Sequence, residues 1–273
     1  MKSQYHLPLS TYPDPSSYNI IDNAIDFAHQ NGAELFVGLL RVRIPAINQP
    51  FPTAIDFDAW RNEAENYSHD QGSLLKKHVF RHASERSLAV RIHEFDARQP
   101  FLLEPVAAMA RCFDLSLIEA NSITRQLSEA LLFDSGRPLV LFPSSKVSRP
   151  VETVAIGWDG SSSMARSVAC SGSLLAAATK VFVISITDDK EINLADRELF
   201  ASSLRWAGLE VEVITVQAGH ETAAVALQTV SLEHRADLLI AGGFGHSRLR
   251  EFVLGGVTRE LLTMTGMPVL MAH

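Results

Sequence analysis

Three short segments in the second half of the chain carry the residues that could bind an anionic ligand. They are Asp-Gly-Ser at 159–161, Gly-Gly-Phe-Gly at 242–245 and Gly-Gly-Val-Thr at 255–258. Glycine lets the backbone approach a ligand closely, and a helix that begins beside such a loop presents amide groups and the positive end of its dipole. The pattern therefore predicts a loop that can cradle phosphate groups.

Each segment also has a purely structural interpretation. Asp-Gly-Ser is a common turn and helix cap, and adjacent glycines allow tight connections between a strand and a helix. His246, Arg248 and Arg250 could face a polyphosphate, but for each one a solvent-exposed basic loop is the alternative. Because all three segments fall at one predicted sheet edge, where open parallel sheets bind ligands, their joint placement favours a ligand site.

An internal repeat sets the expected architecture. Apolar runs at 115–118 and 238–241 each follow an aspartate, and each is succeeded by a helical segment and a Pro-led apolar run, at 138–142 and 268–271. The chain is therefore predicted to contain two tandem domains, 1–146 and 150–273, joined in a polar segment.

The second half alternates apolar strands with amphipathic helices. Strands are expected at 151–158, 181–186, 209–216, 237–241 and 268–272, and helices at 162–178, 194–207, 222–235 and 258–265. Such apolar strands are typical of a parallel sheet covered on both faces, so each half is predicted to be an α/β, doubly wound domain with a five-stranded parallel sheet. The first half adds a Pro-broken insertion at 45–53 and a charged helix at about 58–85, interpreted as a solvated cover.

These features together resemble the universal stress protein superfamily, and specifically its tandem two-domain members with an adenine nucleotide alpha hydrolase-like fold. The family signature is Gly, two residues, Gly, nine residues, and Gly followed by Ser or Thr. Here it reads Gly242, Gly245 and Gly255, with Gly256 in the Ser/Thr position. The resemblance extends through the whole second half and is weaker in the first.

The resemblance implies an adenine nucleotide (ATP, ADP or AMP) in the C-terminal domain, with Mg²⁺ only if ATP is bound. By this resemblance the adenine and ribose region falls on Asp159 and a backbone position at Ile186. The resemblance also implies that the glycine-rich segment contacts the ribose and phosphates. Its residues are Gly242, Gly245, Gly255, Gly256 and Val257, with His246 and Thr258 beside them.

Gly256 is the departure from the signature, because it keeps a backbone amide but lacks the hydroxyl that would bond a phosphate. Losing one such bond costs on the order of 1 kcal/mol, or roughly fivefold in affinity. Thr258, two residues on, is expected to substitute in part.

The first half is predicted to have lost its site. Asp14 occupies the place of Asp159, but the segment after the fourth strand, 119–123, contains no glycine and carries Glu119 at the strand end. The connection is also seven residues shorter, since 24 positions separate Asp114 from Pro138 and 31 separate Asp237 from Pro268. A short, glycine-free loop with a carboxylate should neither wrap nor attract a triphosphate.

Composition limits the classes of partner. A formal net charge of -7 argues against nucleic acid, and the absence of a long apolar run argues against a signal peptide or membrane span. The two cysteines, Cys112 and Cys170, lie in mostly apolar contexts and are expected to act as small hydrophobes in a reducing, cytoplasmic setting. The halves are expected to form an internal pseudo-dimer through the last strand of each, and further pairing of two chains into a homodimer is an open alternative.

The function expected from the resemblance is a stress-response protein that binds a nucleotide and signals through contacts with protein partners not identified by the sequence. The alternatives are a non-nucleotide interaction module of the same fold, and an enzyme for adenylyl or phosphoryl transfer. Hydrolysis is expected to be slow at most, because no metal-site spacing and no Ser-His-Asp or Cys-His arrangement is evident in the sequence.

Overall fold

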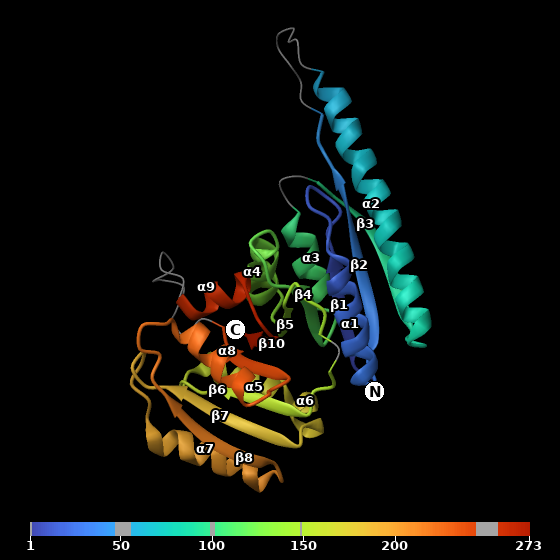
Figure 1. Cartoon of the computed structure of the whole chain (residues 1–273). Helices are drawn as coiled ribbons and strands as arrows, with labels where there is room; N and C mark the ends of the chain where they lie inside the picture. Colours follow the sequence, from blue (N-terminus) through green and yellow to red (C-terminus); the bar gives the residue numbers. More distant parts are fainter. Residues whose placement is uncertain (1, 47–55, 99–101, 148, 244–255) are drawn as a thin grey trace. The chain divides into compact units, whose positions relative to one another are not determined.

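A computed structural model describes residues 2–46, 56–98, 102–147, 149–243 and 256–273 of the chain (Figure 1). The chain divides into two compact units, 1–117 and 118–273, which are described separately. Within the described ranges, none of the helices combines the length and hydrophobicity that crossing a lipid bilayer requires.

Unit 1 is a parallel sheet in the order β3-β2-β1-β4, with helices between its strands. The last two residues of β4 belong to the second unit. Its elements are β1 (Gln4–Leu9), α1 (Tyr18–Gln30), β2 (Glu34–Arg43), α2 (Phe57–Glu85), β3 (Val90–Arg98), α3 (Leu103–Ala110) and β4 (Leu115–Glu119).

The long helix α2 lies along β2 and packs against α1 (Figure 1). Asp56 begins α2 by accepting a hydrogen bond from the amide of Ala59 at 2.9 Å, as an N-cap does. One face of α2 buries Leu75 and Val79, while most of its charged residues face solvent. The expected helix and its role as a solvated cover are therefore confirmed.

Unit 2 contains a six-stranded sheet in the order β5-β10-β9-β6-β7-β8. Its elements are α4 (Arg125–Asp134), β5 (Leu139–Phe142), β6 (Thr153–Gly157), α5 (Ser162–Cys170), α6 (Gly172–Ala177), β7 (Lys180–Ile186), α7 (Leu194–Trp206), β8 (Glu210–Val216), α8 (Ala223–Glu233), β9 (Leu238–Gly242), α9 (Gly256–Thr263) and β10 (Val269–Ala272).

The strand order confirms the α/β fold and the repeat. Across the sheet, the order β8-β7-β6-β9 in unit 2 corresponds to the order β3-β2-β1-β4 in unit 1. Every pair of neighbouring strands in these two series is parallel. The fifth strands of the two sequence halves, β5 and β10, pair antiparallel, with Leu270 opposite Val140. The expectation that the last strands meet is confirmed.

The compact units do not divide where the repeat does. Helix α4 contacts α9, and β5 pairs with β10, so both elements join the second unit although they belong to the first half of the sequence. The predicted domain boundary between residues 146 and 150 rests on the repeated order of strands and helices. It stays a prediction.

Two local expectations are wrong. The helix expected over 162–178 is interrupted at Ser171, whose hydroxyl turns back to the carbonyl of Val168 at 2.8 Å before α6 starts. Both cysteines are exposed, because Cys112 lies in the turn after α3 and Cys170 ends α5 on its outer side.

A buried carboxylate ties α1 to the end of α2. Asp26 has a 2% exposed side chain, and its Oδ1 accepts hydrogen bonds from Arg86 Nε at 2.6 Å and from His82 Nε2 at 3.3 Å. Burial by itself would raise the pKa of Asp26, but hydrogen bonding and charge from Arg86, assisted by His82, hold that pKa below its ordinary value.

Replacing Arg86 by leucine should lower the free energy of unfolding at pH 7 by on the order of 1–3 kcal/mol, because a buried carboxylate loses its half-exposed cation. Because the pKa of Asp26 is lower in the folded state than the unfolded value of about 3.9, the ionised carboxylate stabilises the fold above that unfolded value. This stabilisation is lost as the pH falls through the folded-state pKa. The difference in free energy of unfolding between variant and parent should therefore shrink below about pH 4. Urea unfolding at several pH values measures this difference.

Arg91→Leu, which removes a more exposed 3.7 Å ion pair with Glu34, is the matched control and should change the free energy of unfolding little. An equal effect of Arg86→Leu at pH 7 and pH 3 would contradict the assignment.

Candidate functional site

The candidate site lies where the connections of the second sheet diverge. From β6 the chain proceeds to β7 on one side, while β9, its neighbour on the other side, is reached only after β8. In open parallel sheets such a switch point leaves a crevice beyond the carboxyl ends of the two central strands. Asp159 follows β6 and Gly242 ends β9, so both lie at this edge.

Asp159 is held in a fixed orientation by its neighbours. Its Oδ1 accepts the amide of Ser161 at 2.8 Å, and its Oδ2 lies 3.0 Å from Lys190 Nζ. Partial burial would raise the pKa of Asp159, but hydrogen bonds from Ser161 and the charge of Lys190 lower it below the ordinary value. The side chain is therefore an ionised hydrogen-bond acceptor at neutral pH.

Strand β7 forms the neighbouring wall of this edge. Ile186 is its last residue and is 7% exposed, and the next amide, that of Thr187, donates to the carbonyl of Val216 at 3.0 Å. Trp158 stacks on Phe200 with ring centroids 4.0 Å apart, which covers the side of the sheet beside Asp159. The structure thus brings Asp159 and Ile186 to the ends of adjacent strands, as the sequence predicts for this pair of positions.

The N-terminus of α5 points at the same edge. Ser161 caps this helix by accepting the amide of Met164 at 3.1 Å, and Ser161 and Ser163 hydroxyls lie 3.0 Å apart. A Cβ on Gly242 would stand 2.9 Å from the amide nitrogen of Met164 and 3.0 Å from Ser163 Oγ. Gly242 is therefore required for packing of β9 against α5, whatever ligand it also contacts.

Gly243 closes the end of β9 against β10. Its amide donates to the carbonyl of Ala272 at 3.0 Å, and its carbonyl oxygen lies 3.1 Å from His273 Nδ1. A Cβ here would stand 2.9 Å from the same Ala272 carbonyl. The pair of glycines at 242–243 thus has a structural role in both positions.

Helix α9 begins at Gly256, two residues earlier than the sequence indicates. Gly256 is exposed, and among the described residues no atom lies within 4 Å of the place where its Cβ would stand, whereas Val257 is half-buried and Thr258 is 4% exposed. The other proposed loop residues, Gly245, His246 and Gly255, lie outside the described residues, as do Arg248 and Arg250.

The corresponding loop after β4 is closed by its own side chains. Asn121 Oδ1 accepts the amides of Ile123 at 2.9 Å and Thr124 at 2.8 Å, and Thr124 Oγ1 donates to the carbonyl of Glu119. Amides that would have to face an anion are therefore already bonded, and the Glu119 side chain is 7% exposed. Asp14, the counterpart of Asp159, is exposed in unit 1.

Sequence reasoning missed Lys190, the cation that pairs with Asp159. Lys190 lies in the connection after β7, and its charge alone is not distinctive among the exposed lysines of the chain. Lys190 stands two residues after Asp188, and this acidic residue just beyond β7 is the signal that could have drawn attention to the loop. Asp188 itself accepts the amides of Ala218 at 2.8 Å and Gly219 at 2.9 Å, which lower its pKa and fix the loop after β8.

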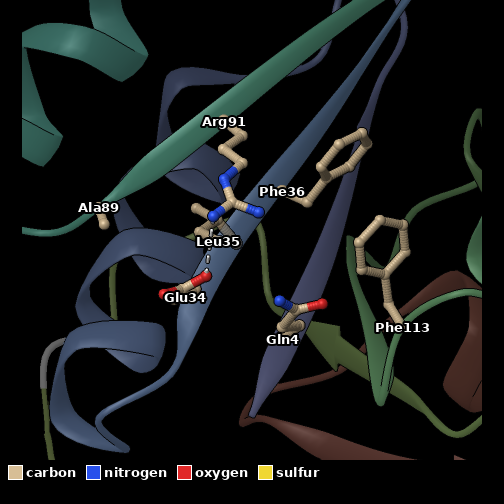
Figure 2. Close-up of a pocket in the computed structure, with 7 residues that line it drawn as sticks. All are labelled: Gln4, Glu34, Leu35, Phe36, Ala89, Arg91 and Phe113. Carbon is tan, nitrogen blue, oxygen red and sulfur yellow. Dashed lines mark ion pairs between the residues drawn. The ribbon is translucent and has the colours of Figure 1, made fainter. Parts of the chain in front are cut away.

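A small pocket in unit 1 is unrelated to this edge (Figure 2). It lies at the start of the strands, among Gln4, Glu34, Phe36, Arg91 and Phe113, and has a volume of about 30 Å³. That volume suits a single water molecule rather than a nucleotide.

Two glycine substitutions should separate packing from ligand contact. Gly242→Ala should destabilise the protein by on the order of 1–3 kcal/mol, because its Cβ would overlap the backbone of α5. Gly256→Ala adds a Cβ in open space at the start of a helix, so it should leave the free energy of unfolding unchanged or raise it by up to about 1 kcal/mol. Denaturant unfolding of both variants is the measurement, and equal stabilities would contradict the close contact of β9 with α5.

Three comparisons relate the chain to known proteins. The universal stress protein Slr1230 of Synechocystis sp. is 26% identical over 181 residues, and this match covers 62% of the present chain and 61% of that relative. The chain is therefore matched to about three fifths of the length of this curated relative. No family model matches the sequence.

Solved structures share the fold at low sequence identity. The crystal structure of a universal stress protein from Archaeoglobus fulgidus has a TM-score of 0.73 and 16% identity, with 98% of this chain and 95% of that chain covered. That of a putative universal stress protein from Pseudomonas aeruginosa has a TM-score of 0.51 and 14% identity, with 99% and 93% covered. The resemblance to the universal stress protein superfamily that the sequence indicates is therefore confirmed, in sequence by a curated relative and in fold by these structures.

Proposed function

We propose that this chain is a stress-response protein that binds an adenine nucleotide at the carboxyl edge of the second sheet. The observation that carries the proposal is the convergence of Asp159, Ile186 and the N-terminus of α5 at the switch point between β6 and β9. Nucleotides bind open parallel sheets at this kind of crevice. The stress-response role is proposed from the similarity of the chain to universal stress proteins.

Asp159 supplies the acceptor for the base or the ribose. Each oxygen of a carboxylate has two lone pairs, so Oδ2 can accept a ligand donor while Oδ1 keeps its bond to Ser161. Lys190 Nζ already lies 3.0 Å from Oδ2, so a ligand must either share this oxygen with Lys190 or displace the lysine. The backbone at Ile186 provides the second contact, at the end of the adjacent strand.

The phosphates extend toward the start of α9. Gly256 begins that helix at an exposed position, where first-turn amides and the helix dipole favour an anion. Gly245, His246 and Gly255 complete the proposed loop, together with Gly242 at the strand end. Mg²⁺ would accompany ATP and would be held mainly by its phosphates.

The proposed response is a shift in population rather than rapid turnover. A nucleotide stabilises the loop arrangement for which it has the higher affinity, and a protein partner that distinguishes the arrangements responds to occupancy. The first half takes no nucleotide in this proposal, since the amides after Glu119 are bonded within their own loop.

A second candidate function is an interaction module that has abandoned nucleotide. Two observations favour this alternative. Gly256 lacks the hydroxyl of the family signature, and Asp159 already forms an ion pair with Lys190. Under this alternative, the carboxyl edge presents a neutralised ion pair to a protein or another small ligand.

Calorimetric titration distinguishes these functions. The parent protein should release or absorb heat with at least one of ATP, ADP and AMP, and Asp159→Ala should weaken that binding about tenfold or more, because a hydrogen bond to a charged group is lost. Asp14→Ala, the same change at the counterpart position in the first half, is the matched control and should leave the affinity unchanged. No heat with any nucleotide at millimolar concentration would favour the interaction module.

Restoring the missing hydroxyl should strengthen binding. Gly256→Ser is expected to tighten ATP binding roughly fivefold, since a serine Cβ meets no atom of the described residues within 4 Å and its hydroxyl can bond a phosphate oxygen. Gly256→Ala controls for the change in backbone freedom and should not share the gain. If serine and alanine have the same effect on the dissociation constant, the phosphates do not lie at the start of α9.

A further inference from the structure

Helix α2 of unit 1 carries a stripe of exposed apolar side chains. Trp60, Tyr67 and Leu74 are 61%, 42% and 45% exposed, and they stand seven residues apart in the sequence. Because two turns of an α-helix take about 7.2 residues, this spacing keeps the three side chains on one face, in a line nearly parallel to the helix axis. Large apolar side chains aligned in this way are typical of a helix that packs against a partner.

The stripe is not the face by which α2 packs along β2 (Figure 1). That face buries Leu75, one residue after Leu74, and successive residues of a helix are turned by about 100° around its axis. The aromatic rings of the stripe each meet one neighbouring ring: Trp60 lies 6.1 Å from Phe57 and Tyr67 lies 6.4 Å from Tyr12, centroid to centroid. These contacts leave a large part of each ring open to solvent.

The charges beside the stripe are separated by sign along the helix. Glu63 and Asp70 are exposed in its N-terminal part, whereas Lys77 and Arg81 are exposed in its C-terminal part. Arg81 donates a hydrogen bond to His78 Nδ1 at 2.8 Å, and none of the four forms an ion pair within the residues that the structure describes. Lys77 and Arg81 are like charges four residues apart, which destabilises an isolated helix. An acidic surface opposite them would reverse that effect.

A helix with this charge distribution is complementary to a second copy of itself. In an antiparallel pair, the acidic part of each helix lies opposite the basic part of the other, whereas a parallel pair would bring like charges together. The helix dipoles favour the antiparallel orientation as well. A contact between two identical surfaces requires such self-complementarity, and a contact with a different protein does not. The charge pattern therefore favours a second copy of this chain as the partner.

We propose that two copies of the chain associate through α2, with the two helices antiparallel and their stripes of Trp60, Tyr67 and Leu74 in contact. The aromatic and aliphatic side chains form the apolar centre of this interface, and the charged residues form its rim. The 29 residues of α2 span about 44 Å at 1.5 Å per residue, which provides a long contact. The interface is separate from the pairing of β5 with β10 and from the proposed nucleotide site, and it depends on neither.

Sedimentation equilibrium of the full chain over a range of concentrations measures the association. Cys112→Ser and Cys170→Ser are present throughout, so that no disulfide between these exposed thiols links two copies. The parent should form a species of twice the chain mass. Trp60→Ala combined with Leu74→Ala should raise the dimer dissociation constant at least tenfold, because the apolar centre is lost. Both side chains are exposed, so the monomer should keep its fold, as circular dichroism would verify.

Exchange of the charges tests the antiparallel orientation. Glu63→Lys with Asp70→Lys makes both parts of the helix basic, so it should raise the dissociation constant at least tenfold. Lys77→Glu with Arg81→Glu makes both parts acidic and should have the same effect. A mixture of these two variants should form a heterodimer. The chain that carries all four changes should dimerise as the parent does, because acidic and basic parts again lie opposite each other.

Glu191→Lys with Glu233→Lys is the matched control, because it changes the net charge equally at two exposed positions of the other unit. This control should leave the dissociation constant unchanged. A parent that stays monomeric at millimolar concentration would overturn the proposal and leave the stripe to a different partner. A dimer that the stripe variant and the charge variants do not weaken, or a folded chain with all four changes that stays monomeric, would overturn it as well.

Discussion

The reversal of strand order between β6 and β9 is the constraint on which the candidate site depends. The chain continues from β6 to β7 on one side and from β9 to β10 on the other, so the strands that follow these two neighbours lie in opposite directions along the sheet. Asp159, the start of α5 and Gly242 consequently meet at one edge, where hydrogen bonds and a close backbone contact fix them. The order is the same in unit 1, where β1 and β4 take these places, so topology alone does not make a site. After β4 the amides of Ile123 and Thr124 are bonded to Asn121, so in unit 1 the side chains of the loop take up amides that an anion would need.

Much of the fold could be predicted from the sequence because apolar strands and amphipathic helices alternate with clear punctuation. The strand expected at 181–186 and the helix at 194–207 each agree with the structure to within one residue, and the charged helix at 58–85 does so as well. Periodicity could not reveal the break at Ser171, where both the backbone amide and the hydroxyl of the serine donate to the carbonyl of Val168. It could not show either that the two thiols face outward, since that depends on which side of a turn or helix end meets solvent.

The site shows the same division. Spacing of the glycines identified the edge, but the reason for Gly242 is its contact with the backbone of Met164, which is visible only in three dimensions. Lys190 is separated from Asp159 by 31 residues and meets it through the fold. Contacts between residues far apart in the sequence, such as this ion pair, cannot be read from local spacing, and the assignment of the site residues stays a prediction.

Amide hydrogen exchange with and without ADP reports on each loop of the intact chain and so distinguishes a nucleotide site in the second half from one in the first. We expect slower exchange on nucleotide binding in peptides covering 157–164 and 242–258, with no change in peptides covering 10–16 and 119–124. Protection of the first-half loops instead, or equal protection of both halves, would contradict a single nucleotide site at the β6–β9 edge.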